Sequence, residues 1–160
     1  MSLQANSPEL NLSASDLAEI LRAILKKGSS ARFKAKGFSM SPLVRNGDII
    51  TVSPFAPATL RSGDIAAFTV EASGRLVVHR IVGIQAESFL MKGDNLAYFD
   101  GLIPGSQVLG QITRIERDGC DVRIGLGAER KVIALLSRFH FLPFLVVPAR
   151  RLFRRWKKTP

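Results

Sequence analysis

Short apolar runs separated by Gly–Asp turn pairs constrain the fold of this chain more than any other feature. Gly47-Asp48, Gly63-Asp64 and Gly93-Asp94 each lie beside such a run, and Asp118-Gly119 is a strong two-residue hairpin signal. Runs of this length suit strands, and strands joined by tight turns pair with antiparallel neighbours. The sequence therefore predicts a compact, largely antiparallel and mainly β domain.

The expected strands follow one another closely. Residues 32–38 alternate polar and apolar side chains, as a strand with one solvent-exposed face does. Further strands are expected at residues 49–54, 65–70, 75–83, 88–92, 108–117 and 120–124.

Helices are expected on both sides of this β-rich region. Ser13 can cap a first helix, which ends at Gly28 and carries leucine and isoleucine on one face. We expect that face to pack on the domain, with membrane or partner docking as the alternative. Residues 131–138 predict a second helix. The expected division is an N-terminal tail and amphipathic helix at 1–30, a β-rich domain at 31–126, and an apolar and basic helical segment at 127–160.

The composition limits the partners and cofactors that this chain can take. Its length of 160 residues suits one domain with a substantial core, and its net charge of +10 favours an anionic partner, either nucleic acid or an anionic membrane surface. Cys120 is the only cysteine and the chain has two histidines. An intrachain disulfide is excluded and a zinc site would lack its usual ligands, so no cofactor and no metal are expected.

The end of the chain combines apolar and basic residues. Residues 139–149 carry no formal charge but reach only about half the length that spans a bilayer. Six cations then follow, interleaved with Leu152, Phe153 and Trp156. This pattern suits the interface of an anionic leaflet; the alternatives are a solvated basic tail and, less favoured because no recognised motif accompanies it, nucleic-acid binding. With neither a secretory signal pattern nor a spanning stretch, we expect peripheral or interfacial membrane association, on a side that the sequence leaves open.

Three residue types that could carry chemistry occur in separate segments. Ser39 lies between an extended run and Pro42, after a glycine that permits a tight turn. His79 lies in an apolar run that has no packing use for an imidazole. Asp94 and Asp100 follow, and each could instead be a turn aspartate that bonds its own backbone. Together they form a potential nucleophile, base and orienting carboxylate, and the sequence leaves open which aspartate contacts His79.

Four short boxes follow one another along the chain. They are Gly37-Phe-Ser-Met-Ser-Pro42 with Asn46-Gly-Asp48, then Gly63-Asp-Ile-Ala-Ala-Phe68, Val78-His-Arg-Ile81, and Lys92-Gly-Asp-Asn95 ending in Asp100. In this order they resemble the boxes of type I signal peptidases, and together they are a stronger signal than any one box alone. The histidine at the base position resembles the endoplasmic-reticulum and archaeal variant.

The resemblance implies a signal-peptidase/LexA-like β-domain and a serine endopeptidase. It would cleave an extended polypeptide after small residues, in exported or membrane-associated precursors. The substrate would add as a strand beside residues 32–38, and shallow pockets near Phe38 and Met40 would select the small residues. The implied catalytic residues are Ser39 as nucleophile, His79 as base and Asp100 as the acidic member, supported by Asp94, Gly37, Met40 and Pro42.

Two departures from the family pattern keep other functions open. Many members carry a serine where this chain has Gly37, and many are anchored by a spanning helix that the expected N-terminal helix is too short and too charged to form. The alternatives are a LexA-like self-cleaving protease, which uses lysine as its base, a non-catalytic peptide-binding module on the same fold, and a basic binder of membrane surfaces or nucleic acid.

Overall fold

A computed structural model describes residues 14–139 and 141 of the chain. It is mainly β, with one helix before the strands and one after them, and this confirms the fold class expected from the sequence. The elements in order are α1 (Ala14–Lys26), β1 (Ala31–Lys34), β2 (Ile49–Ser53), β3 (Ile65–Val70), β4 (Arg75–Gln85), β5 (Ser88–Lys92), β6 (Gly101–Pro104), β7 (Val108–Arg117), β8 (Cys120–Asp121) and α2 (Arg130–Arg138), with short 3-10 turns at Pro57–Thr59 and Gly105–Gln107.

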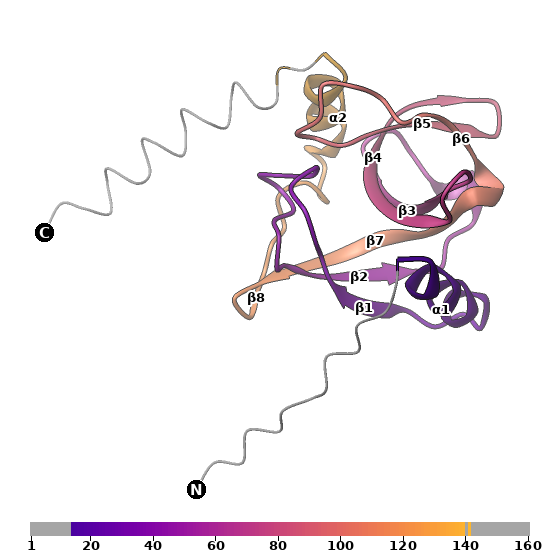
Figure 1. The fold of residues 1–160 in the computed structure, drawn as a ribbon. Coiled ribbons are helices and arrows are strands. Elements are labelled where there is room, and N and C mark those ends of the chain that lie inside the picture. The colour runs from indigo at the N-terminus through magenta and orange to yellow at the C-terminus, as the bar shows by residue number, and fades with distance from the viewer. Residues whose placement is uncertain (1–13, 140, 142–160) are drawn as a thin grey trace, which may run out of the picture.

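All the strands belong to one antiparallel sheet. Its order is β1-β2-β7-β3-β4-β5-β6, and β8 pairs with β7 outside this path. The sheet curls strongly, so that β3 and β4 bend round above the long strand β7 (Figure 1). Register shifts interrupt the pairs β2–β7, β3–β7 and β4–β5, and irregularities of this kind increase local bending and twist.

Two apolar clusters fill the two faces of the curled sheet. The first joins the inner face of α1, through Ala18, Leu21 and Leu25, to β2, β3 and β7. The second lies within the curl of β3–β6 and contains Phe68 and Met91. The expectation that the first helix packs on the domain is therefore confirmed, and the second cluster provides the apolar surroundings of His79.

The strand expected at residues 32–38 ends at Lys34 because the chain turns there. Ala35 still donates its N–H to the Asp48 carbonyl at 2.7 Å, but Gly37 has a φ of +95°, which lies outside the strand region. A turn segment follows up to Asp48. Ser39 therefore lies in a loop between two paired strands rather than at the end of a strand.

Other boundaries differ from expectation for local reasons. β4 continues to Gln85, beyond its expected end at Gly83, because Ile84 and Gln85 still pair with β5. β8 has two residues instead of five, although the Asp118-Gly119 hairpin forms as expected, with φ values of 52° and 78°. The sequence missed β6 altogether, since its four residues, Gly101–Pro104, begin with glycine and end with proline.

The helices lie at opposite ends of the molecule (Figure 1). Within residues 14–139 and 141, no helix is both long and apolar enough to cross a membrane. The expected Ser13 cap, most of the apolar run at 139–149 and the basic cluster after it lie outside the described residues.

Candidate active site

His79 and Asp100 are in direct contact. His79 belongs to β4, and its Nδ1 lies 2.6 Å from Oδ2 of Asp100. Asp100 ends the loop between β5 and β6, and its backbone N–H donates to the Met91 carbonyl at 2.9 Å. A carboxylate accepts and cannot donate, so this partner assigns the proton to Nδ1 in the neutral ring. Nε2 is then the nitrogen left to exchange a proton with a substrate or nucleophile.

The imidazole lies in largely apolar surroundings. His79 is buried, and its ring centroid is 6.1 Å from that of Phe68 on β3. Alternating side chains place both residues on the face of β3 and β4 that lines the second apolar cluster. A hydrogen bond to a charged group is electrostatically stronger in such surroundings than in water. The contact with Asp100 therefore fixes the orientation of the ring.

The turn that carries Ser39 is fixed at both ends. Gly37 donates its N–H to Oδ1 of Asn46 at 3.0 Å, and its φ of +95° would strain any side chain larger than hydrogen. This backbone conformation favours glycine at position 37. Met40 is 4% exposed and packs in the first apolar cluster, and the Ser41–Pro42 peptide bond is cis. Met40 therefore anchors the turn from inside, whereas Phe38 is exposed. The shallow pockets that the sequence analysis expected near these two residues stay a prediction.

The loop of residues 93–100 connects Ser39 to the His79–Asp100 pair. Asn95 donates its backbone N–H to the Ser39 carbonyl at 2.8 Å and its side-chain amide to the Phe38 carbonyl at 3.3 Å. A Cβ on Gly93 would lie 2.8 Å from the Ser39 carbonyl oxygen, so only glycine permits this approach. The same loop ends at Asp100.

The hydroxyl of Ser39 has no hydrogen bond within the described part of the chain, and therefore none to His79. Ser39 itself is half-buried. The structure thus brings His79 and Asp100 together, and it holds Ser39 beside their loop through its backbone. Hydrogen bonds of a catalytic group are often long or poorly aligned in the free enzyme and tighten when substrate binds.

Asp94 takes a different role from Asp100. Its two carboxylate oxygens accept hydrogen bonds from Nε and Nη2 of Arg80, at 2.8–3.2 Å, and both side chains are fully buried. Nη1 of Arg80 also donates to the carbonyls of Gly63 and Gly125, at 2.7 and 3.0 Å. Every polar group of this buried pair thus has partners, as a buried ion pair requires. Asp94 supports the loop through Arg80 and does not contact His79.

Lys92 is a second buried cation beside the same loop. Its side chain is fully buried, and Nζ donates to the Gly93 carbonyl at 3.3 Å. Burial lowers the pKa of this lysine, although the charges of Asp94 and Asp100 act in the opposite direction. The site therefore holds an amine that loses its proton more easily than an ordinary lysine does.

Asp48 fixes the far end of the serine turn. Arg117 at the end of β7 donates to both of its carboxylate oxygens, at 2.8 and 2.7 Å, and the Arg45 N–H donates at 2.7 Å. Burial by itself would raise the pKa of Asp48, but these hydrogen bonds outweigh it and hold the pKa below the usual aspartate value. This carboxylate is a structural anchor.

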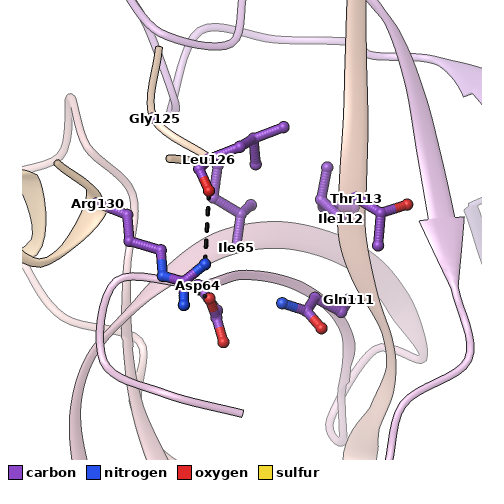
Figure 2. A pocket seen from close by; sticks show the side chains of 8 residues that line it. All are labelled: Asp64, Ile65, Gln111, Ile112, Thr113, Gly125, Leu126 and Arg130. Atoms are coloured by element: carbon purple, nitrogen blue, oxygen red, sulfur yellow. Dashed lines mark hydrogen bonds and ion pairs between the residues drawn. The ribbon is translucent and has the colours of Figure 1, made fainter. Parts of the chain in front are cut away.

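Two hollows lie away from these residues. One of about 210 Å³ is bounded by Asp64 and Arg130, which form an ion pair at 3.2 Å, and by Gln111 on β7 (Figure 2). A neighbouring one of about 320 Å³ shares Thr113 and Leu126 with it. Neither includes Ser39, His79 or Asp100. Among the residues described, no group of three or more His, Cys, Asp or Glu side chains is arranged to hold a metal ion.

The sequence analysis gave no role to Arg80, Lys92, Asn95 or Phe68. Arg80 and Lys92 could have been noticed, because each is a cation inside or at the end of an apolar strand, where an unpaired charge is costly. Asn95 and Phe68 carry no such signal. Their contacts with Phe38, Ser39 and His79 come from segments far apart in the chain.

A model of the Peptidase S24-like family matches residues 2–113. The curated relatives that match include the "Signal peptidase complex catalytic subunit SEC11C" of Homo sapiens, Mus musculus and Canis lupus familiaris. Each is 34% identical over 62 residues, which cover 36% of this chain and 32% of the relative. The match thus spans about a third of the length of these relatives.

Proposed function

Because this chain belongs to the Peptidase S24-like family, we propose that it is a serine endopeptidase resembling type I signal peptidases. Ser39 is the nucleophile, His79 the general base, and Asp100 the residue that orients the base. The observation that carries the proposal is the 2.6 Å contact between His79 Nδ1 and Asp100 Oδ2, next to the loop that binds the Ser39 carbonyl.

The chemistry proceeds by acyl transfer. Oγ of Ser39 attacks the peptide carbonyl carbon while Nε2 of His79 takes its proton, and Asp100 stabilises the resulting imidazolium. The C–N bond then breaks as Nε2 returns the proton to the leaving amine. A water molecule, deprotonated by the same nitrogen, attacks the acyl ester and releases Ser39.

The backbone N–H of Ser39 is the proposed donor to the oxyanion. It makes no hydrogen bond within the described part of the chain, so it is free to bind the negative oxygen of the tetrahedral intermediate. Gly37 cannot add the second, hydroxyl donor that many relatives carry at this position. We therefore expect the enzyme to depend strongly on backbone donors.

The substrate is proposed to bind as an added strand along β4. Among the described residues, those at 75–79 pair with β3 on one side only, because pairing with β5 begins at Arg80. A peptide along this free edge would run up to His79. β1 is also an edge strand, as the sequence analysis required, but the edge of β4 leads directly to the general base.

The natural substrates are proposed to be exported or membrane-associated precursors with small residues before the cut. The net charge of +10 supports work at an anionic membrane surface, with the C-terminal cations closest to the lipid. Nucleic acid is not the proposed partner.

Peptide cleavage by the full chain tests the proposal. The substrate is a peptide with alanine before the scissile bond, and an acylating serine-protease probe reports the reactive residue by mass spectrometry. Ser39→Ala should abolish both cleavage and labelling. Ser41→Ala, the same change two residues away, should leave both intact. Labelling that persists in Ser39→Ala would overturn the assignment of the nucleophile.

A LexA-like self-cleaving protease is the second candidate, and Lys92 favours it. A buried lysine with a lowered pKa is the kind of base that such an enzyme uses, and Gly93 next to it contacts the Ser39 carbonyl. His79→Gln and Lys92→Met separate the two bases, because each mechanism is abolished by only one of these changes. The non-catalytic module predicts instead that peptide binds uncut, with or without Ser39.

A further inference from the structure

The outer face of α2 is apolar. Val132, Leu135 and Phe139 are 60%, 57% and 57% exposed, and their spacing of three and four residues places them on one side of the helix. The buried residues Ile133 and Ala134 face the opposite way, toward the domain.

A helix with two apolar faces needs two partners. An ordinary surface helix is polar where it meets water, whereas one that is apolar all round is buried. The domain covers one face of α2, which packs against β4. Within the described residues nothing covers the other face, and Phe141, just beyond the helix, is 58% exposed as well.

The charge of this region indicates what the second partner is. From Arg130 to Pro160 the sequence contains nine Lys or Arg residues and no Asp or Glu. Lys131 is exposed beside the apolar face, and six further cations follow at residues 150–158. Apolar side chains bordered by cations match a surface with an apolar interior and anionic headgroups.

We propose that the outer face of α2 is a docking surface for an anionic lipid bilayer. The helix lies flat on the leaflet, with Val132, Leu135 and Phe139 at the boundary between headgroups and acyl chains. This deepens the membrane-surface part of the proposed function and does not depend on Ser39. The helix lies at one end of the molecule (Figure 1), so the bilayer can approach it without contacting α1.

Vesicle flotation with the full chain in a Ser39→Ala background tests the proposal. The vesicles contain phosphatidylcholine alone or with phosphatidylserine. Replacing Leu135 and Phe139 together by Asn should weaken binding to the anionic vesicles by about tenfold or more, because two buried apolar contacts are lost. The matched control replaces Ile20 on α1 and Leu102 on β6, which are 43% and 48% exposed, by Asn, and should bind like the parent.

A reporter on the helix separates the lipid from other occupants. Val132→Trp, with Trp156→Phe to remove the native tryptophan, should show a blue-shifted emission and quenching by brominated lipid only on anionic vesicles. A blue shift without vesicles would mean that the chain covers its own helix. Unchanged binding of the double Asn variant would mean that the tail binds alone. Either result overturns the proposal and leaves peptide cleavage, measured separately in solution, as the test of the proposed function.

Discussion

At the scale of single residues, the choice between two aspartates decides how His79 is oriented. Asp94 and Asp100 both follow β5, and both could be ordinary turn residues by sequence. In the structure, Asp94 pairs with Arg80 and Asp100 contacts His79. The roles differ because Asp94 is enclosed with a cation, whereas Asp100 lies at the edge of the buried imidazole.

Asp100→Asn should lower kcat/KM for peptide cleavage by about 10²–10⁴-fold, because an amide no longer selects the right tautomer or stabilises the imidazolium. Steady-state kinetics checks this. Asp118→Asn is the matched control, since asparagine tolerates the φ of 52° at that hairpin position. Equal activity of Asp100→Asn and the parent would contradict the role given to Asp100.

Lys92→Met should change how stability depends on pH. Burial lowers the pKa of Lys92 in the folded state, whereas a lysine in the unfolded chain has a pKa of about 10.4. As the pH rises, the folded protein therefore loses this proton at a lower pH than the unfolded chain does. Between these two pKa values the unfolded chain binds more protons, so the free energy of unfolding rises with pH. Lys92→Met removes this rise.

Denaturant unfolding across the alkaline range measures the effect. The variant should be at least as stable as the parent at neutral pH, because an apolar side chain replaces a buried charge. This difference in the free energy of unfolding should shrink as the pH approaches the pKa of lysine in the unfolded chain. Lys34→Met on the exposed side of β1 should leave the pH dependence unchanged. A parallel pH dependence of Lys92→Met and the parent would mean that folding does not lower the pKa of Lys92.

At the scale of elements, one loop coordinates the candidate site. Residues 93–100 contact the serine turn through Asn95, β4 through Asp94 and Arg80, and the imidazole through Asp100. Arg80 extends this connection to the turns at Gly63 and Gly125. The geometry of the site thus depends on an ion pair that is itself remote from the chemistry.

Asp94→Asn should destabilise the fold by about 3–5 kcal/mol, because it leaves the buried guanidinium of Arg80 without a counter-charge. Chemical denaturation measures this loss. Asp121→Asn, which breaks the exposed pair with Arg114, should have little effect on stability. If Asp94→Asn were as stable as Asp121→Asn, the buried pair would not hold the loop.

At the scale of the whole molecule, charge is distributed unevenly. Residues 130–160 contribute nine cations to a chain whose net charge is +10. Binding to anionic vesicles should therefore weaken strongly between physiological salt and 1 M, as the Debye length falls from about 8 Å to about 3 Å.

The apolar face of α2 should leave a residual binding at 1 M salt that the double Asn variant at Leu135 and Phe139 lacks. Flotation of both proteins over a salt series measures this. Loss of all binding of the parent at 1 M salt would show that attraction between charges acts alone, without contact through α2.

The sequence by itself determined the elements with a local cause. Turn pairs such as Asp118-Gly119 set where strands end, helical spacing set α1 and α2, and the order of four boxes singled out Ser39, His79 and Asp100. These features depend on residues close together in the chain, so local patterns reveal them.

Only the tertiary structure decided which carboxylate meets the imidazole, that Arg80 and Asp94 pair in the interior, and that β6 forms at all. Each of these depends on segments that the curled sheet brings together, and no local pattern encodes them. The tertiary structure also decided which face of α2 is exposed. The spacing of apolar residues predicts the helix, but only its packing against β4 shows which of its two apolar faces remains outside.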